Sequence, residues 1–198
     1  MSSILDMLSG PLGGAIAQQV AGKIGADQNT TSKALSAAMP LLLSALARNA
    51  SQPQGAESLH RALSNDHDGG ILDDVMGFLG NPAVANGAGI LKHVLGGQQA
   101  TVQQGIAKAS GLDASAVASL LQIAAPLVMG ALGKATAQQG LDPNGLSQFL
   151  GGQQQELQSS PQSSGVMGML GGLLDQNNDG SIADDVLNLA GKFFGGKK

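Results

Sequence analysis

The sequence contains no cysteine, no tryptophan and no tyrosine, and it has only four phenylalanines in 198 residues. Without cysteine, disulfides, thiolate catalysis and cysteine-based zinc or iron–sulfur sites are excluded. Nucleic-acid binding is disfavoured, because the net charge is -4 and aromatic side chains that stack on bases are scarce. Glutamate occurs only as Glu57 and Glu156, and no Gly-x-Ser-x-Gly motif is present. We therefore expect a protein that is not an enzyme.

Charged residues are also scarce, at 12% of the chain, which is about half of the usual share. The hydrophilic surface must then consist largely of uncharged side chains, which favours self-association or binding to a protein partner. Residues 1–6 lack the positive region of a signal peptide. No apolar run reaches the roughly 18 residues that a membrane span needs. We therefore expect a cytoplasmic protein without an integral membrane segment.

Two segments of the chain, at about residues 13–50 and 99–136, resemble each other. A shift of 86 positions, which places Pro40 on Pro126, aligns ten identical residues. In the first segment these are Gln18, Ala21, Gly25, Asp27, Leu35, Ala38, Pro40, Leu41, Ala45 and Leu46. Identities that include proline, glycine and aspartate exceed what a shared bias toward alanine and leucine would give. The sequence therefore predicts an internal duplication.

The spacing of apolar residues is helical, most clearly over residues 120–132. Asp27 and Asp113, each shortly after a glycine, are expected to cap the N-termini of the two main helices. Pro40 and Pro126 fall inside the same apolar stretches, where proline removes a backbone hydrogen bond and predicts a kink or a break into two short helices. No alternating strand pattern is present. The predicted fold class is all-α, a helical bundle built from the internal duplication.

The domain organisation follows from composition. Residues 1–137 are expected to form a compact helical domain that contains both repeats. Residues 138–164 are rich in Gln, Ser and Gly and predict a flexible linker, although Asp142 followed by Pro143 is typical of a helix start. Residues 165–198 are expected to form an EF-hand-like helix–loop–helix with an Asp-rich loop.

The Asp-rich loop of the last segment has the oxygen-ligand spacing of an EF-hand calcium loop. Positions 1, 3, 5, 6, 7 and 8 of that pattern are matched by Asp175, Asn177, Asp179, Gly180, Ser181 and Ile182. Position 12, where a bidentate carboxylate is usual, is Val186, and Asp185 is the nearest replacement. The predicted calcium ligands are Asp175, Asn177, Asp179, Ser181 and Asp185. The alternative is a turn followed by a helix start, where the helix dipole stabilises the acidic residues.

A related loop occurs earlier in the chain and contains Asp66, Asp68, Asp73 and Asp74. It keeps the Asp-Gly turn and the following acidic pair, but its first ligand position is Ser64. A turn followed by a helix N-terminus is therefore favoured over a cation site here.

The three histidines, His60, His67 and His93, each stand alone in the sequence. No His-x3-His pair is present, and no cysteine could complete a metal site. We interpret all three as surface or half-buried side chains.

Three segments carry a family resemblance: residues 89–97 (GILKHVLGG), 107–112 (AKASGL) and 125–134 (APLVMGALGK). Together with the ending at 179–187 (DGSIADDVL), they resemble the YidB-like family of small bacterial proteins. The resemblance covers nearly the whole chain and implies an all-helical, duplicated fold. It brings no assigned catalytic or binding residues.

The sequence is compatible with three classes of function. The first is a non-enzymatic structural or protein-interaction module with a structural calcium site in the C-terminal loop. The second is a protein that binds an apolar small molecule or lipid in a cleft between the two repeats. The third, a hydrolase that uses the loop aspartates and a metal, requires an open coordination position beside a cleft.

Overall fold

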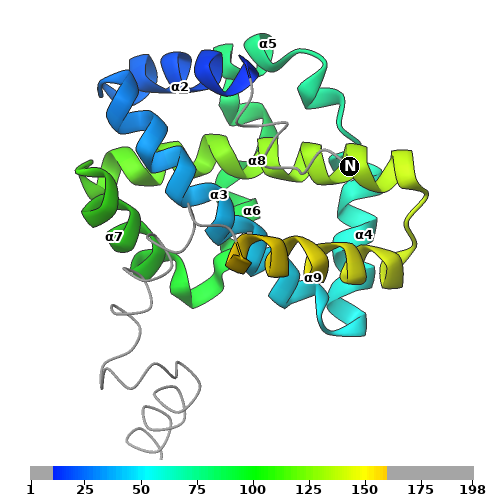
Figure 1. Cartoon of the computed structure of the whole chain (residues 1–198). Coiled ribbons are helices and arrows are strands. Elements are labelled where there is room, and N and C mark those ends of the chain that lie inside the picture. Colours follow the sequence, from blue (N-terminus) through cyan, green and yellow to red (C-terminus); the bar gives the residue numbers. More distant parts are fainter. Residues whose placement is uncertain (1–10, 160–198) are drawn as a thin grey trace, which may run out of the picture. The chain divides into compact units, whose positions relative to one another are not determined.

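A computed structural model describes residues 11–159, and every regular element in that range is a helix. The α-helices are α2 (Pro11–Ile24), α3 (Gln28–Ala50), α4 (Pro53–Asp66), α5 (Val75–Gly80), α6 (Gly87–Leu95), α7 (Gln99–Ser110), α8 (Ala114–Gln139) and α9 (Pro143–Ser159). Three short 3-10 helices connect them: η1 (Gly70–Leu72), η2 (Pro82–Ala85) and η3 (Gly96–Gln98). The predicted all-α class is confirmed (Figure 1).

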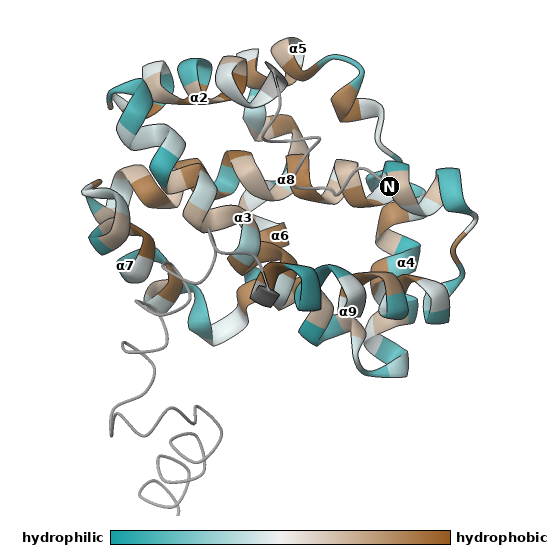
Figure 2. Cartoon of the chain, in the orientation of Figure 1, coloured by the Kyte–Doolittle hydropathy of each residue, from teal (hydrophilic) through white to brown (hydrophobic). Residues whose placement is uncertain are grey.

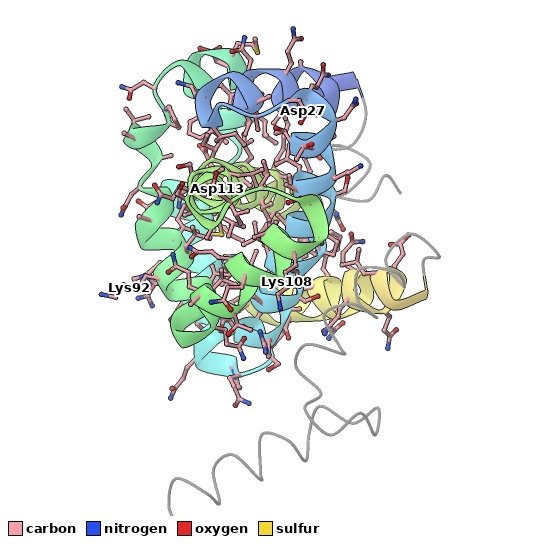
Figure 3. All side chains as sticks on the ribbon, turned by 90° about the vertical axis from the view of Figure 1, so that its left-hand side faces the viewer. Asp27, Lys92, Lys108 and Asp113 are labelled. Carbon is pink, nitrogen blue, oxygen red and sulfur yellow. The ribbon has the colours of Figure 1, made fainter. Side chains whose placement is uncertain are left out.

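Helix α8 is the centre of the fold. All residues from 123 to 133 are buried, and α3, α4, α6 and α7 pack against this helix. A helix that is apolar on every side must be surrounded by protein or lipid. Figure 3 looks along α8 from its start at Asp113, with the other helices placed around it, and Figure 2 shows the apolar residues concentrated on α8 and α6.

The apolar character of α8 has a structural explanation. Among residues 11–159 it is the one helix long and apolar enough to cross a membrane, but 83% of its most apolar window is buried inside the protein. The surrounding helices supply the apolar environment that the helix requires. Its composition is therefore accounted for by its position in the core.

Both predicted N-caps are confirmed. The carboxylate of Asp27 accepts a hydrogen bond from the Thr30 backbone N–H at 2.9 Å, and that of Asp113 accepts from the backbone N–H of Ser115 and of Ala116, each at 2.9 Å. These bonds satisfy backbone donors that have no partner within the helix. They also stabilise the ionised carboxylates, so the pKa of Asp27 and of Asp113 is lowered, mainly by Thr30 and by Ser115 respectively.

The Asp113 cap predicts that the stability of the fold depends on pH. The folded-state pKa of Asp113 lies below its ordinary value of 3.8, so its contribution is present above that pH and is lost as the pH falls through the lowered folded-state pKa. We expect Asp113→Ala to lower the urea midpoint modestly at about pH 7, and the difference from wild type to narrow below pH 3.8. Asp113→Asn keeps an acceptor oxygen and should lose less. If the urea midpoints of Asp113→Ala and wild type differ equally at neutral and at strongly acidic pH, the role of the charged carboxylate is contradicted.

The prolines do not break their helices. Pro40 lies inside the continuous helix α3 and Pro126 inside the continuous helix α8, so the predicted alternative of two short helices is wrong at both positions. Both prolines are buried, and burial of the apolar residues on either side holds each helix together despite the missing hydrogen bond. Proline at 126 leaves the carbonyl of Gln122 without its usual helical donor.

The structure corrects the flexible linker predicted over residues 138–164, because Pro143–Ser159 forms α9. Asp142 accepts a hydrogen bond from the Gly145 backbone N–H at 2.7 Å, so the predicted helix start is confirmed. Leu146 and Leu150, one turn apart, are 0% and 1% exposed. Glutamine is a good helix former, and the buried leucine face outweighs the linker-like composition. The chain divides into two units, Met1–Leu157 and Gln158–Lys198, and the first therefore contains most of α9.

Candidate functional site

The predicted calcium ligands Asp175, Asn177, Asp179, Ser181 and Asp185 lie outside the described residues. The C-terminal helix–loop–helix around them lies outside as well. The calcium site therefore stays a prediction from the sequence.

The earlier aspartate loop is a turn followed by a helix start, as predicted. The Asp68 carboxylate accepts from the Gly70 backbone N–H at 2.9 Å, and Asp74 caps α5 by accepting from the Gly77 backbone N–H at 2.8 Å. Asp73 forms an ion pair with Lys134 on α8 at 2.9 Å. These carboxylates bind separate partners, and residues 11–159 contain no group of three or more His, Asp or Glu side chains that could hold a metal ion.

The same loop packs its backbone directly on α8. A β-carbon added at Gly133 would lie 1.7 Å from the His67 carbonyl oxygen, and one added at Gly130 would lie 2.3 Å from a methyl group of Ile71. Gly130 and Gly133 are nearly one helical turn apart and thus share a face of α8. The sequence signal for this contact is the Gly-x-x-Gly spacing of Gly130 and Gly133 within an otherwise apolar helix.

The three histidines do not converge. His60 Nε2 lies 2.8 Å from the Leu141 carbonyl oxygen, and His93 Nδ1 lies 2.9 Å from the Gly89 carbonyl oxygen. Burial lowers the pKa of the half-buried His67, and the nearby Asp66 carboxylate partly opposes that shift. The interpretation as surface or half-buried side chains is confirmed.

An apolar groove lies between α4 and α6, and we call it the α4–α6 groove. Its volume is about 440 Å³. Helices α4 and α6 both pack on α3 and α8, and side chains from all four helices line the space between them. The lining residues used below are Leu46 from α3, Ser58, Leu59 and Ala62 from α4, Ile90, His93 and Val94 from α6, and Met129 from α8.

The walls of the groove have helical spacing. On α4 the lining residues are Gly55, Ser58, Leu59 and Ala62, and on α6 they are separated by the same intervals of three and four. The α4 wall consists mostly of small side chains. Small residues at these intervals leave room beside the helix, and this is the sequence signal that could have located the groove.

Two asparagines hold α6 in place beside the groove. Asn86 adopts a left-handed conformation with φ of 48° and accepts from the Gly89 backbone N–H at 3.2 Å, so it caps the start of α6. Asn49 on α3 donates to the Val94 carbonyl oxygen at 3.1 Å near the end of the helix. Asn49 thus joins the end of α6 to α3, and Asn86 determines where α6 begins.

The groove is not where the sequence placed a binding cleft. The predicted cleft lay between the repeats at about 13–50 and 99–136, whereas α4 and α6 both belong to the segment between them. Only Leu46, Asn49 and Met129 come from the repeats. The difference arises because α4 and α6, both from the chain between these two segments, pack on α3 and α8.

A second, more polar pocket of about 490 Å³ adjoins the start of α6. Lys23, Ser119 and Gln122 are among its lining residues, and the Lys23 ammonium donates to the Gly80 carbonyl oxygen at 3.3 Å. Its polar side chains come from α2, from α8 and from Asn86 before α6, and all of them are exposed.

A sequence model of a bacterial protein family of unknown function, DUF937, matches residues 6–135. The chain belongs to this family. The resemblance to the YidB-like family is confirmed, since the two names denote one family. The whole α4–α6 groove falls within the DUF937 match, whereas α9 and the predicted calcium loop follow it. No curated protein and no solved structure matches the chain.

Proposed function

We propose that this protein is a non-enzymatic helical binding module that holds an apolar group in the α4–α6 groove. The observation that carries this proposal is the groove itself, with apolar side chains from four helices around a volume of about 440 Å³. Sites for small molecules typically occupy about 300–1,000 Å³ and are lined mainly by apolar side chains with a few polar groups. The α4–α6 groove has this size and composition.

The surroundings of the groove favour binding over catalysis. Of the described residues that line it, none carries a formal charge, and His93 is the single titratable one. The aspartates of the earlier loop, which a metal-dependent hydrolase would need, are engaged by backbone donors and by Lys134. This arrangement supports a binding module and speaks against the hydrolase hypothesis.

A groove-filling variant tests the proposal. N-phenyl-1-naphthylamine is an uncharged apolar fluorophore, and its emission rises on entering an apolar site. The wild-type protein should bind it saturably, whereas Ser58→Phe should weaken binding by about tenfold or more, because the new ring occupies the groove. Ser64→Phe is the matched control, since Ser64 is an exposed residue of α4 that does not line the groove. Absence of saturable binding, or equal binding by both variants, would refute the proposal.

We also propose that the two repeats descend from one duplicated unit. Support comes from their matched local geometry: Gly25 and Gly111 both have positive φ, at 68° and 84°, and each is followed by an aspartate N-cap and a long helix with an interior proline. A sequence profile built from residues 13–50 of related proteins should detect residues 99–136 of those proteins.

The calcium site is a further proposal, and the spacing of Asp175, Asn177 and Asp179 supports it. Calcium that binds only the folded loop should stabilise it increasingly as the free calcium concentration rises above the Kd. We expect heat in isothermal titration at millimolar calcium, and none from an Asp175→Ala/Asp179→Ala variant. If the wild-type protein shows neither heat nor a change in melting temperature, the calcium proposal fails.

A further inference from the structure

We infer that the occupant of the α4–α6 groove is an uncharged amphiphile, a linear alkyl chain that ends in a hydroxyl group, with this hydroxyl donating to His93 Nε2. This inference rests on the proposed function and adds to it the chemical class of the ligand. Its support comes from the hydrogen bond of His93 Nδ1 to Gly89, from the absence of charge along the described lining and from the dimensions of the groove.

The hydrogen bond of His93 to its own helix decides which ring nitrogen is available. Nδ1 lies 2.9 Å from the Gly89 carbonyl oxygen, and a carbonyl oxygen can only accept, so Nδ1 carries the hydrogen. In a neutral imidazole the other nitrogen, Nε2, is then an acceptor. A ligand hydroxyl can donate to Nε2, whereas a carboxylate would place its lone pairs against it and a quaternary ammonium has no hydrogen to donate.

The other polar groups at the groove do not favour an ionic ligand. The Asn49 amide nitrogen donates to the carbonyl oxygens of His93 and Val94, and the Asn86 side-chain oxygen caps α6. No formal charge lies on the described lining residues. An ionised headgroup would find no counter-charge among these residues. Charge complementarity therefore selects a neutral ligand.

The apolar lining residues indicate that the apolar part of the ligand is an alkyl chain. Ile90 and Val94 on α6, with Leu59 opposite and Leu46 and Met129 from the core helices, present aliphatic side chains and a thioether. Helix α6 has nine residues, so the strip beside it is about 13 Å long at the helical rise per residue. The volume of about 440 Å³ is within the range of sites for small molecules, whereas a stable protein interface buries more than about 1,000 Å². The groove is on the scale of an alkyl chain.

Displacement of N-phenyl-1-naphthylamine from the full chain tests the ligand class. Three ligands with the same ten-carbon chain are compared at about pH 8: decan-1-ol, decanoate and decyltrimethylammonium. We expect decan-1-ol to displace the fluorophore at a concentration at least tenfold below that of either ion.

A pair of neighbouring variants tests the role of His93. His93→Ala should weaken decan-1-ol binding by up to about tenfold, the effect of one neutral hydrogen bond, and should weaken decan-1-ol binding more than it weakens fluorophore binding. Lys92→Ala is the matched control, because Lys92 lies on the same helix and projects away from the other helices (Figure 3). Thermal melts of both variants check that α6 stays folded.

The possible failures are distinguishable. If the fluorophore does not bind saturably, the proposed function fails and the ligand class falls with it. If the fluorophore binds but all three ligands displace it equally, or His93→Ala behaves like Lys92→Ala, the proposed function stands and the inferred ligand class is overturned.

Discussion

Gly133→Ala should lower the free energy of unfolding by about 3 kcal/mol or more, at the upper end of the range for overpacked cores. A β-carbon at this position would lie 1.7 Å from the His67 carbonyl oxygen and 2.8 Å from its carbonyl carbon. Both are backbone atoms, so no side-chain rotation relieves the clash. Either α8 or the loop that follows α4 must move, and the Asp73–Lys134 ion pair would be strained with it.

The expected sign is opposite to the usual effect of this substitution in a helix. Replacing glycine by alanine in a helix normally stabilises it by roughly 0.5–1 kcal/mol. Gly22→Ala in α2 is the matched control, since a β-carbon there would meet nothing within 4 Å, and we expect a gain of that size. Urea denaturation followed by far-UV circular dichroism measures both. A Gly133→Ala protein as stable as wild type would show that the loop does not lie on α8 as described.

Gly87→Ala should lower the free energy of unfolding by a similar amount, about 2–3 kcal/mol, because this position is overpacked in the same way. The added β-carbon would lie 1.9 Å from the Gln122 carbonyl oxygen and 2.7 Å from its carbonyl carbon. That carbonyl is the one left without a helical donor by Pro126. Gly87, the first residue of α6, thus approaches α8 at the Gln122 carbonyl oxygen, which has no donor within the helix. Only glycine permits so close an approach of the two backbones.

Two measurements separate this effect from a general loss of stability. Gly80→Ala at the end of α5 is the control, because a β-carbon there meets nothing within 4 Å. Since α6 forms one wall of the α4–α6 groove, Gly87→Ala should also weaken fluorophore binding under conditions where the protein is still folded. A Gly87→Ala protein that melts like Gly80→Ala would contradict the close approach of α6 and α8.

The features predicted correctly from the sequence depend on neighbouring residues. Asp27, Asp113 and Asp142 were recognised as helix starts because an N-cap is a contact between a side chain and backbone groups two or three residues away. The turn at Asp68 and the cap at Asp74 are equally local. Such contacts form in any context that allows the helix to begin, so the order of residues is sufficient to predict them.

The incorrect predictions share a different cause. The break into two short helices at Pro126 and the flexible linker over residues 138–164 both rest on local propensity alone. Burial of α8 on all sides, and of Leu146 and Leu150 on α9, outweighs that propensity. Tertiary burial contributes more to helix stability than intrinsic preference does.

The sequence by itself determined the all-α class, the places where several of the helices begin, and the bacterial family to which the chain belongs. Only the tertiary structure decided that the earlier aspartate loop packs on α8 and that an apolar groove lies between α4 and α6. Both depend on backbones meeting at glycines and on two helices sharing the same neighbours, α3 and α8. Such contacts join residues far apart in the chain, and no local pattern encodes the distance between them.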